Sequence, residues 1–384
     1  MKAIVINSCM PPAELTIRGG IFHAPPIDQG NTSRLFSQCH GNTGNAVIGY
    51  SVCTILRESG CEIALNIGSL DELSLKWDRF EQMILQAPLV FLCLQDLLRP
   101  DAIEIWSPQQ LELIVRLCQS ASCRLCVLSL GSNHLEDITA PGDLVLTSIL
   151  PREVIQVLDA IIEHSMALQV RTEGLRLAID LAYPRKSINW LHPGCPSYYR
   201  KDINKDRLMR NLSDIKTWRE CGRKVLGGGL FGFKTSELFA RTAYIPQSFS
   251  ELLLSNRLYV GDPAFSYPYN STAVTAALAT ASIVTFIGAR AWQDHLSRED
   301  FLWYTGTRLH GGIMALLEGI PAVFTGGDKR TKDFTDHFLL PWHTGILLED
   351  APQIISNWDW EATMAAQREE KNAFWKQIKR LINT

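Results

Sequence analysis

Two residues that could bind and protonate a small anion lie in a glycine- and threonine-rich turn near position 308. The stretch Tyr304–Gly312 reads YTGTRLHGG and follows an apolar run, Phe301–Tyr304, that is predicted to be a strand. We expect a helix to begin near Arg308. Arg308 and His310 would then occupy its first turn, where backbone N–H groups and the helix dipole favour anions. Arginine offers a planar fork for carboxylate or phosphate, and histidine exchanges a proton near neutral pH. The same residues also fit an ordinary helix start with a surface arginine and a packed histidine.

A second charged turn follows the next predicted strand, Ala322–Phe324, and contains Asp328, Lys329 and Arg330. Because the carboxyl ends of parallel strands lie at one edge of a sheet, these side chains would lie beside Arg308. Arg308, Lys329 and Arg330 could surround one small polyanion. Asp328 could orient a base or a hydroxyl. The alternative interpretation is an ordinary solvated loop.

A glycine-rich turn in the N-terminal half, Gly41–Asn45, precedes a helix that we expect to begin near Ala46. It is neither a dinucleotide-binding fingerprint nor a Walker loop, but it could hold a phosphate or sugar hydroxyls. The stretch Leu226–Leu230 (LGGGL) is interpreted as a loop. Cys195 carries a potential nucleophile, but no helix N-terminus clearly follows it, and the sequence shows no evident histidine partner.

Apolar strands alternate with amphipathic helices in both halves of the chain. The strands are continuous apolar runs, as in parallel sheets that are buried on both faces. We expect strands at Ala3–Asn7, Leu89–Gln95, Leu125–Leu130, Met166–Arg171, Ala243–Pro246, Ile283–Ile287, Phe301–Tyr304 and Ala322–Phe324. We expect helices at Ala46–Ser59, Pro108–Ser120, Pro151–Glu163, Asn270–Thr280, Arg308–Glu318, Thr331–Phe338 and Glu361–Ile382. The pattern predicts an α/β protein with two Rossmann-like domains that face a cleft, at residues 1–199 and 225–384.

The segment between these domains, residues 200–224, holds nine Lys or Arg and four Asp or Glu. We interpret it as a solvated linker or surface helix in preference to a basic binding patch. In the whole chain of 384 residues, 46% are hydrophobic and 20% are charged, and the net charge is −3. This composition argues against a disordered chain and against a dedicated nucleic-acid binder.

Compartment and metal binding can also be addressed from the sequence. No apolar window is long enough to span a membrane, and the N-terminus does not have the pattern of a signal peptide. The ten cysteines are scattered, several of them in apolar runs, which fits buried free thiols in a reducing, cytoplasmic compartment. The pair Cys123 and Cys126 has no second cysteine or histidine pair at zinc spacing, so we expect no metal there.

The chain resembles the polysaccharide pyruvyl transferase family at several of these turns. The most specific match is Gly306–Gly311 (GTRLHG), followed by a helix that ends in Gly-Ile-Pro321 and by Asp328-Lys-Arg330. Three further segments match family motifs in the same order: Gly41–Asn45, Val170–Glu173 (VRTE) and Gly194–Ser197 (GCPS). The resemblance spans about residues 40 to 340. It departs at Asn45, where the family usually has aspartate.

This resemblance implies a fold like that of the GT-B glycosyltransferases. It also implies that the pyruvyl group of phosphoenolpyruvate is transferred to a sugar diol, with formation of a cyclic ketal and release of phosphate. The acceptor would be a saccharide or lipid-linked saccharide of a glycan or glycan precursor, on the side of residues 1–199. Peripheral contact with a membrane would fit a lipid-linked acceptor. The donor site would lie in residues 225–384, and Arg171 would add a second guanidinium from the facing domain.

We predict His310 and Asp328 as catalytic residues. His310 is the best-placed acid or base for protonation of the methylene carbon, and Asp328 is a second candidate or the group that orients it. The predicted substrate-binding residues are Asn42, Gly44, Asn45, Arg171, Arg308, Leu309, Gly311, Lys329 and Arg330. The chemistry requires neither a metal nor an organic cofactor.

Two other functions fit the same residues. A GT-B glycosyltransferase could use the basic turn near Arg308 to hold the diphosphate of a nucleotide sugar. A relative that binds a sugar or metabolite without catalysis would account for Asn45, which replaces a carboxylate. The Arg-Leu-His turn with Asp-x-Arg favours the pyruvyl donor over both.

Overall fold

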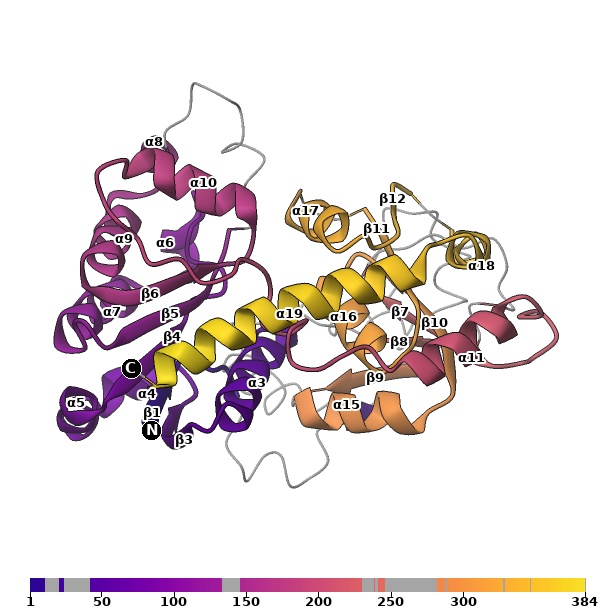
Figure 1. Cartoon of the computed structure of the whole chain (residues 1–384), viewed down its shortest axis with the longest axis horizontal. Coiled ribbons are helices and arrows are strands. Elements are labelled where there is room, and N and C mark those ends of the chain that lie inside the picture. Colours follow the sequence, from indigo (N-terminus) through magenta and orange to yellow (C-terminus); the bar gives the residue numbers. More distant parts are fainter. Residues whose placement is uncertain are drawn as a thin grey trace, which may run out of the picture.

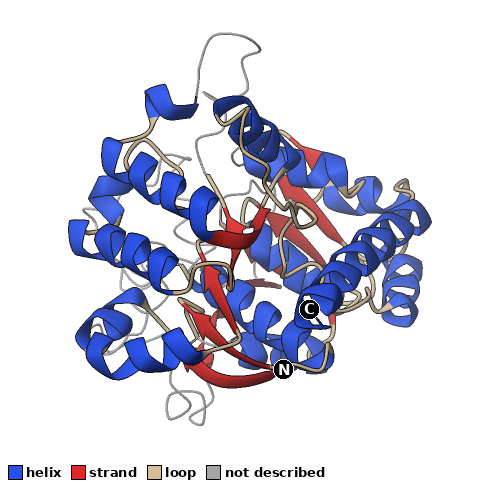
Figure 2. Cartoon of the chain, turned by 60° about the vertical axis from the view of Figure 1, so that its left-hand side comes forward, coloured by secondary structure: helices blue, strands red, loops and turns tan. Residues whose placement is uncertain are grey.

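Two α/β units make up the protein, and a long C-terminal helix lies along both of them (Figure 1). The computed structural model describes residues 1–10, 21–23, 42–132, 146–229, 238, 241–245, 282–286, 289–326, 329–345 and 347–383. In these residues each unit has a sheet with helices on its faces (Figure 2). The predicted α/β class with two Rossmann-like domains is confirmed.

The N-terminal sheet is entirely parallel, in the order β3-β1-β4-β5-β6. Its strands are β1 (Lys2–Ile6), β3 (Glu62–Ile67), β4 (Leu89–Cys93), β5 (Leu125–Leu130) and β6 (Ser165–Val170). This order is doubly wound, with helices on both faces, so β4 and β5 are buried at every position. The helices are α3 (Thr43–Glu58), α4 (Leu70–Leu75), α5 (Trp77–Gln86), α6 (Ala102–Ile105), α7 (Pro108–Ser120), α8 (Leu146–Ile149), α9 (Arg152–His164) and α10 (Glu173–Ala182).

The second sheet has the order β12-β11-β10-β7-β8-β9-β2. Its strands are β7 (Lys224–Gly228), β8 (Thr242–Tyr244), β9 (Ser282–Phe286), β10 (Phe301–Gly306), β11 (Ala322–Thr325) and β12 (Trp342–His343), all parallel, with β2 (Ile21–His23) antiparallel at the edge. The helices are α11 (Lys205–Ile215), α15 (Ala289–Arg298), α16 (Leu309–Leu317), α17 (Lys329–His337), α18 (Ala351–Ser356) and α19 (Trp360–Asn383). Since β2 comes from the first 25 residues, the N-terminal segment of the chain takes part in both sheets.

The predicted elements agree with the structure where apolar periodicity is strong. Pro108–Ser120 and Leu125–Leu130 have the predicted bounds, because Ser107 and Gln110 form a capping box around Pro108 and the strand is continuously apolar. The helix predicted at Asn270–Thr280 lies outside the described residues. Within the basic segment 200–224, the structure has the helix α11 and then the start of β7.

The interpretation of Leu226–Leu230 as a loop is wrong, because its first three residues belong to β7, between β10 and β8. The glycines here allow neighbouring strands and side chains to approach. A Cβ atom on Gly228 would lie less than 3 Å from the Tyr304 hydroxyl. One on Gly306 of β10 would lie less than 3 Å from the carbonyl oxygen of Gly228. Glycine marks close packing within the sheet at this position.

The two units share one hydrophobic core. A single cluster of buried side chains includes Val47 and Ile48 of α3, Phe91 of β4, Ile313 of α16 and Phe374 of α19. The opposite face of the N-terminal sheet packs in a second cluster, against α4, α5, α7 and α9. Because α3 lies in the shared core, the units pack together through apolar contact and are not joined by a linker alone.

A segment that we call the junction loop, residues 191–203, runs between the two units and is held by α19. The Nε2 amide of Gln367 donates hydrogen bonds to the carbonyl oxygens of Tyr198 (2.7 Å) and Lys201 (2.9 Å). The indole of Trp375 donates to the carbonyl of Tyr199 at 2.7 Å. These side chains satisfy backbone groups that water would otherwise have to reach.

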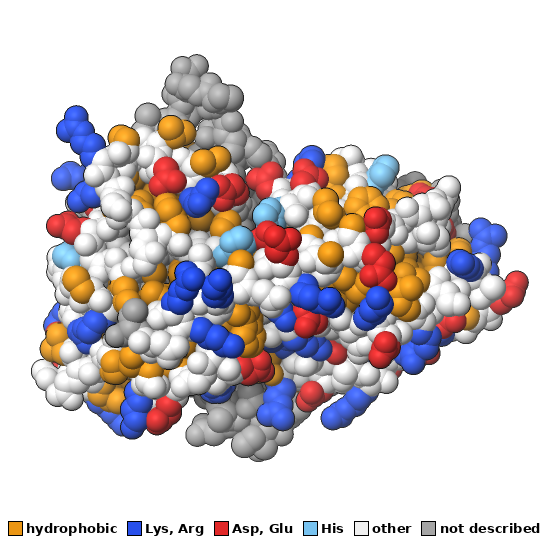
Figure 3. Space-filling model, in the orientation of Figure 1, with side chains coloured by type: hydrophobic (Ala, Val, Ile, Leu, Met, Phe, Trp, Pro, Cys, Tyr) orange, Lys and Arg blue, Asp and Glu red, His pale blue; other side chains and the backbone are white. Residues whose placement is uncertain are grey.

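Surface charge is mixed on the face drawn in Figure 3, where Lys and Arg side chains are interspersed with Asp and Glu, in line with the net charge of −3. None of the helices in the described part of the chain is both long enough and apolar enough to cross a membrane.

We expect Gln367→Ala to lower the stability of the whole molecule, because it leaves two carbonyl groups of the junction loop without their donor. The loss should be about 2 kcal/mol, the usual cost of unsatisfied buried polar groups. The measurement is the midpoint of denaturant unfolding. The control is Glu369→Ala, an exposed position on the same helix, which should leave the midpoint unchanged. Equal midpoints for both variants would contradict this role of Gln367.

Candidate functional site

The N-terminus of α3 begins three residues earlier than predicted, so the turn Gly41–Asn45 contributes the helix start itself. Asn42 is the N-cap, and its side-chain oxygen accepts a hydrogen bond from the backbone N–H of Gly44 at 2.9 Å. Asn45 is buried within the first turn. Further along α3, Gly49 packs directly on the backbone carbonyl of Ser8, just beyond β1. This contact fixes where the first turn of α3 lies.

The N-terminus of α16 follows β10, as predicted. Arg308 is the N-cap, half-buried, and its carbonyl oxygen accepts a hydrogen bond from the Tyr304 hydroxyl at 2.8 Å. Leu309, His310 and Gly311 form the first turn and are buried. Gly312 packs on the ring of Phe324 from β11, where a Cβ atom would lie less than 3 Å from the ring. The helix therefore sits tightly against its own sheet.

These two helix starts meet at His310. A Cβ atom on Gly44 would lie less than 3 Å from Nδ1 of His310, so the ring packs directly against the first turn of α3. On its other edge, Nε2 of His310 is 3.6 Å from Sγ of Cys195 in the junction loop. The ring is only 5% exposed and Cys195 only 1%. The structure thus brings together Gly44, Cys195 and His310 from three distant parts of the sequence.

The sequence interpretation of Cys195 is corrected by this contact, because the thiol does have a histidine partner. Its own Sγ also donates to the Ser197 hydroxyl at 3.2 Å. With both groups buried, the pair acts as a packed contact between the junction loop and α16. The alternative interpretation of His310, a packed histidine at a helix start, therefore describes its environment in this structure.

Arg171 occupies the carboxyl edge of the N-terminal sheet. The side chain follows β6 and is 4% exposed. Its Nη1 donates to the carbonyl oxygen of Gln95 (3.1 Å) and to Oδ1 of Asp96 (3.2 Å), which both follow β4. Gly131, after β5, packs on its aliphatic stem. Arg171 is therefore fixed at the end of three neighbouring strands.

A cleft of about 320 Å³ opens between the two units beside Arg171. One side is formed by the start of α10 and by the junction loop, the other by α17. The lining residues are Arg171, Thr172, Glu173, Gly174, Pro193, Gly194, Asp333, Phe334, Asp336, His337 and Phe338. Gly194 lines this cleft while the next residue, Cys195, contacts His310, so the junction loop separates the cleft from the His310 contact.

The turns around Arg308 and Lys329 are neighbours in space, as predicted, because β10 and β11 pair in parallel. Lys329 and Arg330 form the first turn of α17. Their side chains, and Asp328, lie outside the described residues, so their predicted roles stay predictions.

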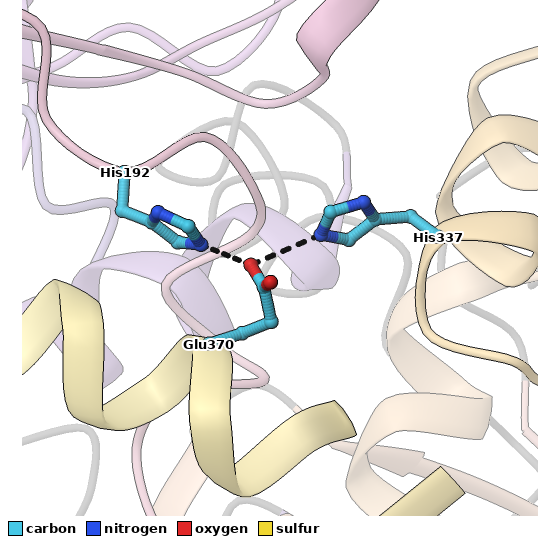
Figure 4. Close-up of side chains that lie close together, drawn as sticks. All are labelled: His192, His337 and Glu370. Carbon is cyan, nitrogen blue, oxygen red and sulfur yellow. Dashed lines mark hydrogen bonds and ion pairs between the residues drawn. The ribbon is translucent and has the colours of Figure 1, made fainter. Parts of the chain in front are cut away.

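One polar cluster was not found from the sequence (Figure 4). Glu370 of α19 holds His192 of the junction loop and His337 of α17 through one carboxylate oxygen, Oε2; the distance to Nε2 of His337 is 3.0 Å. Burial alone would raise the pKa of Glu370, but the hydrogen bonds from both imidazoles lower that pKa to about 2. The hydrogen bond with Glu370 also raises the pKa of His337, against the effect of burial. The histidines are 178 and 33 positions from Glu370, so no local motif indicates the cluster.

The cysteines of the apolar runs are buried and free, as predicted. Burial raises the pKa of Cys53 to about 11 and the pKa values of Cys118 and Cys126 to about 12. These thiols are therefore protonated at neutral pH and are not nucleophiles.

Comparisons with known proteins found no matching family model and no matching curated protein. Among solved structures the chain is similar to WaaG, a glycosyltransferase involved in lipopolysaccharide biosynthesis, at 9% identity over 97% of this chain and 95% of that one, with a TM-score of 0.40. It is also similar to Glycyrrhiza uralensis UGT73P12 complexed with glycyrrhetinic acid 3-O-monoglucuronide, at 10% identity over 97% and 90% of the chains, with a TM-score of 0.37. The chain itself has two α/β units, each with its own sheet, and a cleft between them.

The contact between Gly44 and His310 predicts a specific coupling. Gly44→Ala should destabilise the protein by about 1–3 kcal/mol, the usual cost of overpacking, although alanine is normally the better helix former. In a His310→Ala background the added methyl group fills the space of the missing ring, so the penalty should largely disappear. A double-mutant cycle of unfolding free energies measures this coupling. Additive effects would mean that the two residues do not touch.

Proposed function

We propose that the chain is a ketal-forming pyruvyl transferase that moves the pyruvyl group of phosphoenolpyruvate to a sugar diol and releases phosphate. The observation that carries the proposal is the meeting of Gly44 and His310 at the starts of α3 and α16. The two turns that resemble the family lie far apart in the sequence, yet they come into direct contact where the two units meet. Both helix starts direct backbone N–H groups toward this region, which favours an anionic ligand.

The donor carries a phosphate and a carboxylate, which require several cations. Arg308 supplies a guanidinium at the start of α16, and the first turn of α17, with Lys329 and Arg330, follows the neighbouring strand. Arg171, the second predicted guanidinium, is held by Gln95 and Asp96 on the cleft side of the junction loop, so it would reach the same donor only if that loop moved. A bidentate arginine would fix the orientation of the anionic group that it binds.

The chemistry needs one proton delivered to carbon. His310 protonates the methylene carbon of the donor, which creates an oxocarbenium-like centre at the neighbouring carbon. One acceptor hydroxyl adds there, the carbon–oxygen bond to phosphate breaks, and the second hydroxyl closes the ketal. Of the two hydroxyl protons released, one restores the acid and the other leaves with phosphate. Since the ring is 5% exposed and packed between Gly44 and Cys195, the donor reaches His310 only when α3 and α16 move apart.

Binding of phosphoenolpyruvate tests the donor site directly by calorimetric titration. We expect the natural protein to bind it and Arg308→Ala to bind at least about 10-fold more weakly, because a hydrogen bond to a charged group contributes about 1.5–3 kcal/mol. The control is Arg290→Ala, an exposed position on α15, which should bind normally. If the natural protein ignores phosphoenolpyruvate even with a diol acceptor present, and instead binds a nucleotide sugar, it is a glycosyltransferase. Binding with no turnover of any diol would indicate a non-catalytic relative.

His310→Asn should slow phosphate release by 100-fold or more while KM changes little, because general acid catalysis typically contributes 10²–10⁴-fold. Cys195→Ala is the matched variant, since it removes the other partner of the ring but leaves the acid in place. It should keep most of the rate. Retention of more than about a tenth of the rate by His310→Asn would overturn the general-acid role. Thermal unfolding of both variants checks that they fold.

A further inference from the structure

Three metal-ligating side chains from three separate segments converge at the edge of the cleft (Figure 4). His192 belongs to the junction loop, His337 ends α17, and Glu370 lies on α19. One ligand atom from each side chain lies within 4.8 Å of the other two. Both imidazoles direct Nε2 at the same carboxylate oxygen, so the three donor atoms face a common point.

We propose that His192, His337 and Glu370 form a binding site for a divalent transition metal ion of the zinc type. Two imidazoles and one carboxylate are a donor set that zinc prefers, whereas magnesium and calcium prefer oxygen ligands. Ligand bonds of about 2.0–2.2 Å in tetrahedral geometry place neighbouring ligand atoms about 3.3 Å apart. The 3.0 Å between Nε2 of His337 and Oε2 of Glu370 is close to that spacing, whereas Nε2 of His192 lies nearer to the same oxygen, so the His192 ring must move outward to admit an ion.

The exposure of the site suits an ion. The side chains of His192, Glu370 and His337 are 23%, 21% and 39% exposed, so the ion can enter from solvent and water can complete its shell. Figure 3 shows histidine and acidic side chains together on this face.

The supports of the three ligands are rigid. His192 is fixed by a hydrogen bond of 2.6 Å from its backbone N–H to Oε1 of Gln377, which lies two helical turns beyond Glu370 on the same face of α19. The backbone N–H of Leu191 donates to Leu168 of β6 at 2.9 Å. The two other ligands are on helices, and the ring of Phe338 packs edge-on against His337. A site built on such elements loses little entropy when the ion binds.

A bound ion would tie together α17 from one unit, the junction loop and α19. His337 also lines the cleft opposite Arg171, so the ion would lie at the rim of the cleft and fix its width. This inference goes beyond the proposed transferase activity and does not depend on it. The ion would act on the arrangement of the units, and no step of the proposed reaction passes through it.

Metal titration of chelator-treated protein tests the site. We expect calorimetry to show one Zn²⁺ per chain, and Co²⁺ to give the visible absorption of a site with nitrogen and oxygen ligands. Zn²⁺ should also raise the thermal unfolding temperature. Glu370→Gln and His337→Gln should each weaken Zn²⁺ binding by more than about 100-fold, since even outer-shell partners of a metal site are worth about 10–100-fold. Two variants are used so that a folding defect in one does not decide the outcome.

Two further variants show where any bound ion sits. His343→Gln changes an exposed histidine of β12, and Cys123→Ser removes an exposed thiol that would compete for the ion; both variants should bind Zn²⁺ normally. The proposal is overturned if the natural protein binds no Zn²⁺, in which case the cluster is an ion pair only. It is also overturned if binding survives unchanged in both Glu370→Gln and His337→Gln, or if Cys123→Ser abolishes it.

Discussion

The structure depends on the backbone of the junction loop, which must be buried and yet fully hydrogen-bonded. An irregular segment between two packed units has no regular ladder to satisfy its N–H and C=O groups, so side chains must do so. Gln367, Trp375 and Gln377 of α19 do this from one side. Gln169 of β6 does it from the other, with its Nε2 donating to the carbonyl of Gly194 at 2.9 Å.

Several side chains where the two units meet take their positions from this loop. Residues 192, 194 and 195 are almost consecutive, but they serve three places: the His–Glu cluster, the cleft and the contact with His310. Arg200, further along, places its guanidinium 5.3 Å over the ring of Tyr50 in α3 and donates to Gln293 of α15. A shift of the loop would therefore disturb both units at once, which couples the geometry of the cleft to the core.

The sequence predicts most of the architecture because buried parallel strands are continuously apolar. It misses β3 (Glu62–Ile67), an edge strand in which only Ile67 is fully buried and which contains the polar residues Glu62 and Asn66. The turn at Arg308 is predictable because it follows the buried strand β10. The partners of His310 are not predictable from the sequence, since Gly44 and Cys195 reach it only through the packing of the two units. The same holds for Glu370, whose place on α19 gives no hint that two distant histidines will meet it.

The long helix α19 also limits how the cleft can change. Its 24 residues make a rod of about 36 Å, at 1.5 Å per residue, and the rod touches both units. A hinge that bent the molecule across this rod would have to break the helix or strip its bonds from the junction loop. Rotation around the rod, or sliding along it, keeps both intact. Helix α19 therefore resists bending between the two units, and the relative motions that cost little free energy are twist and shear.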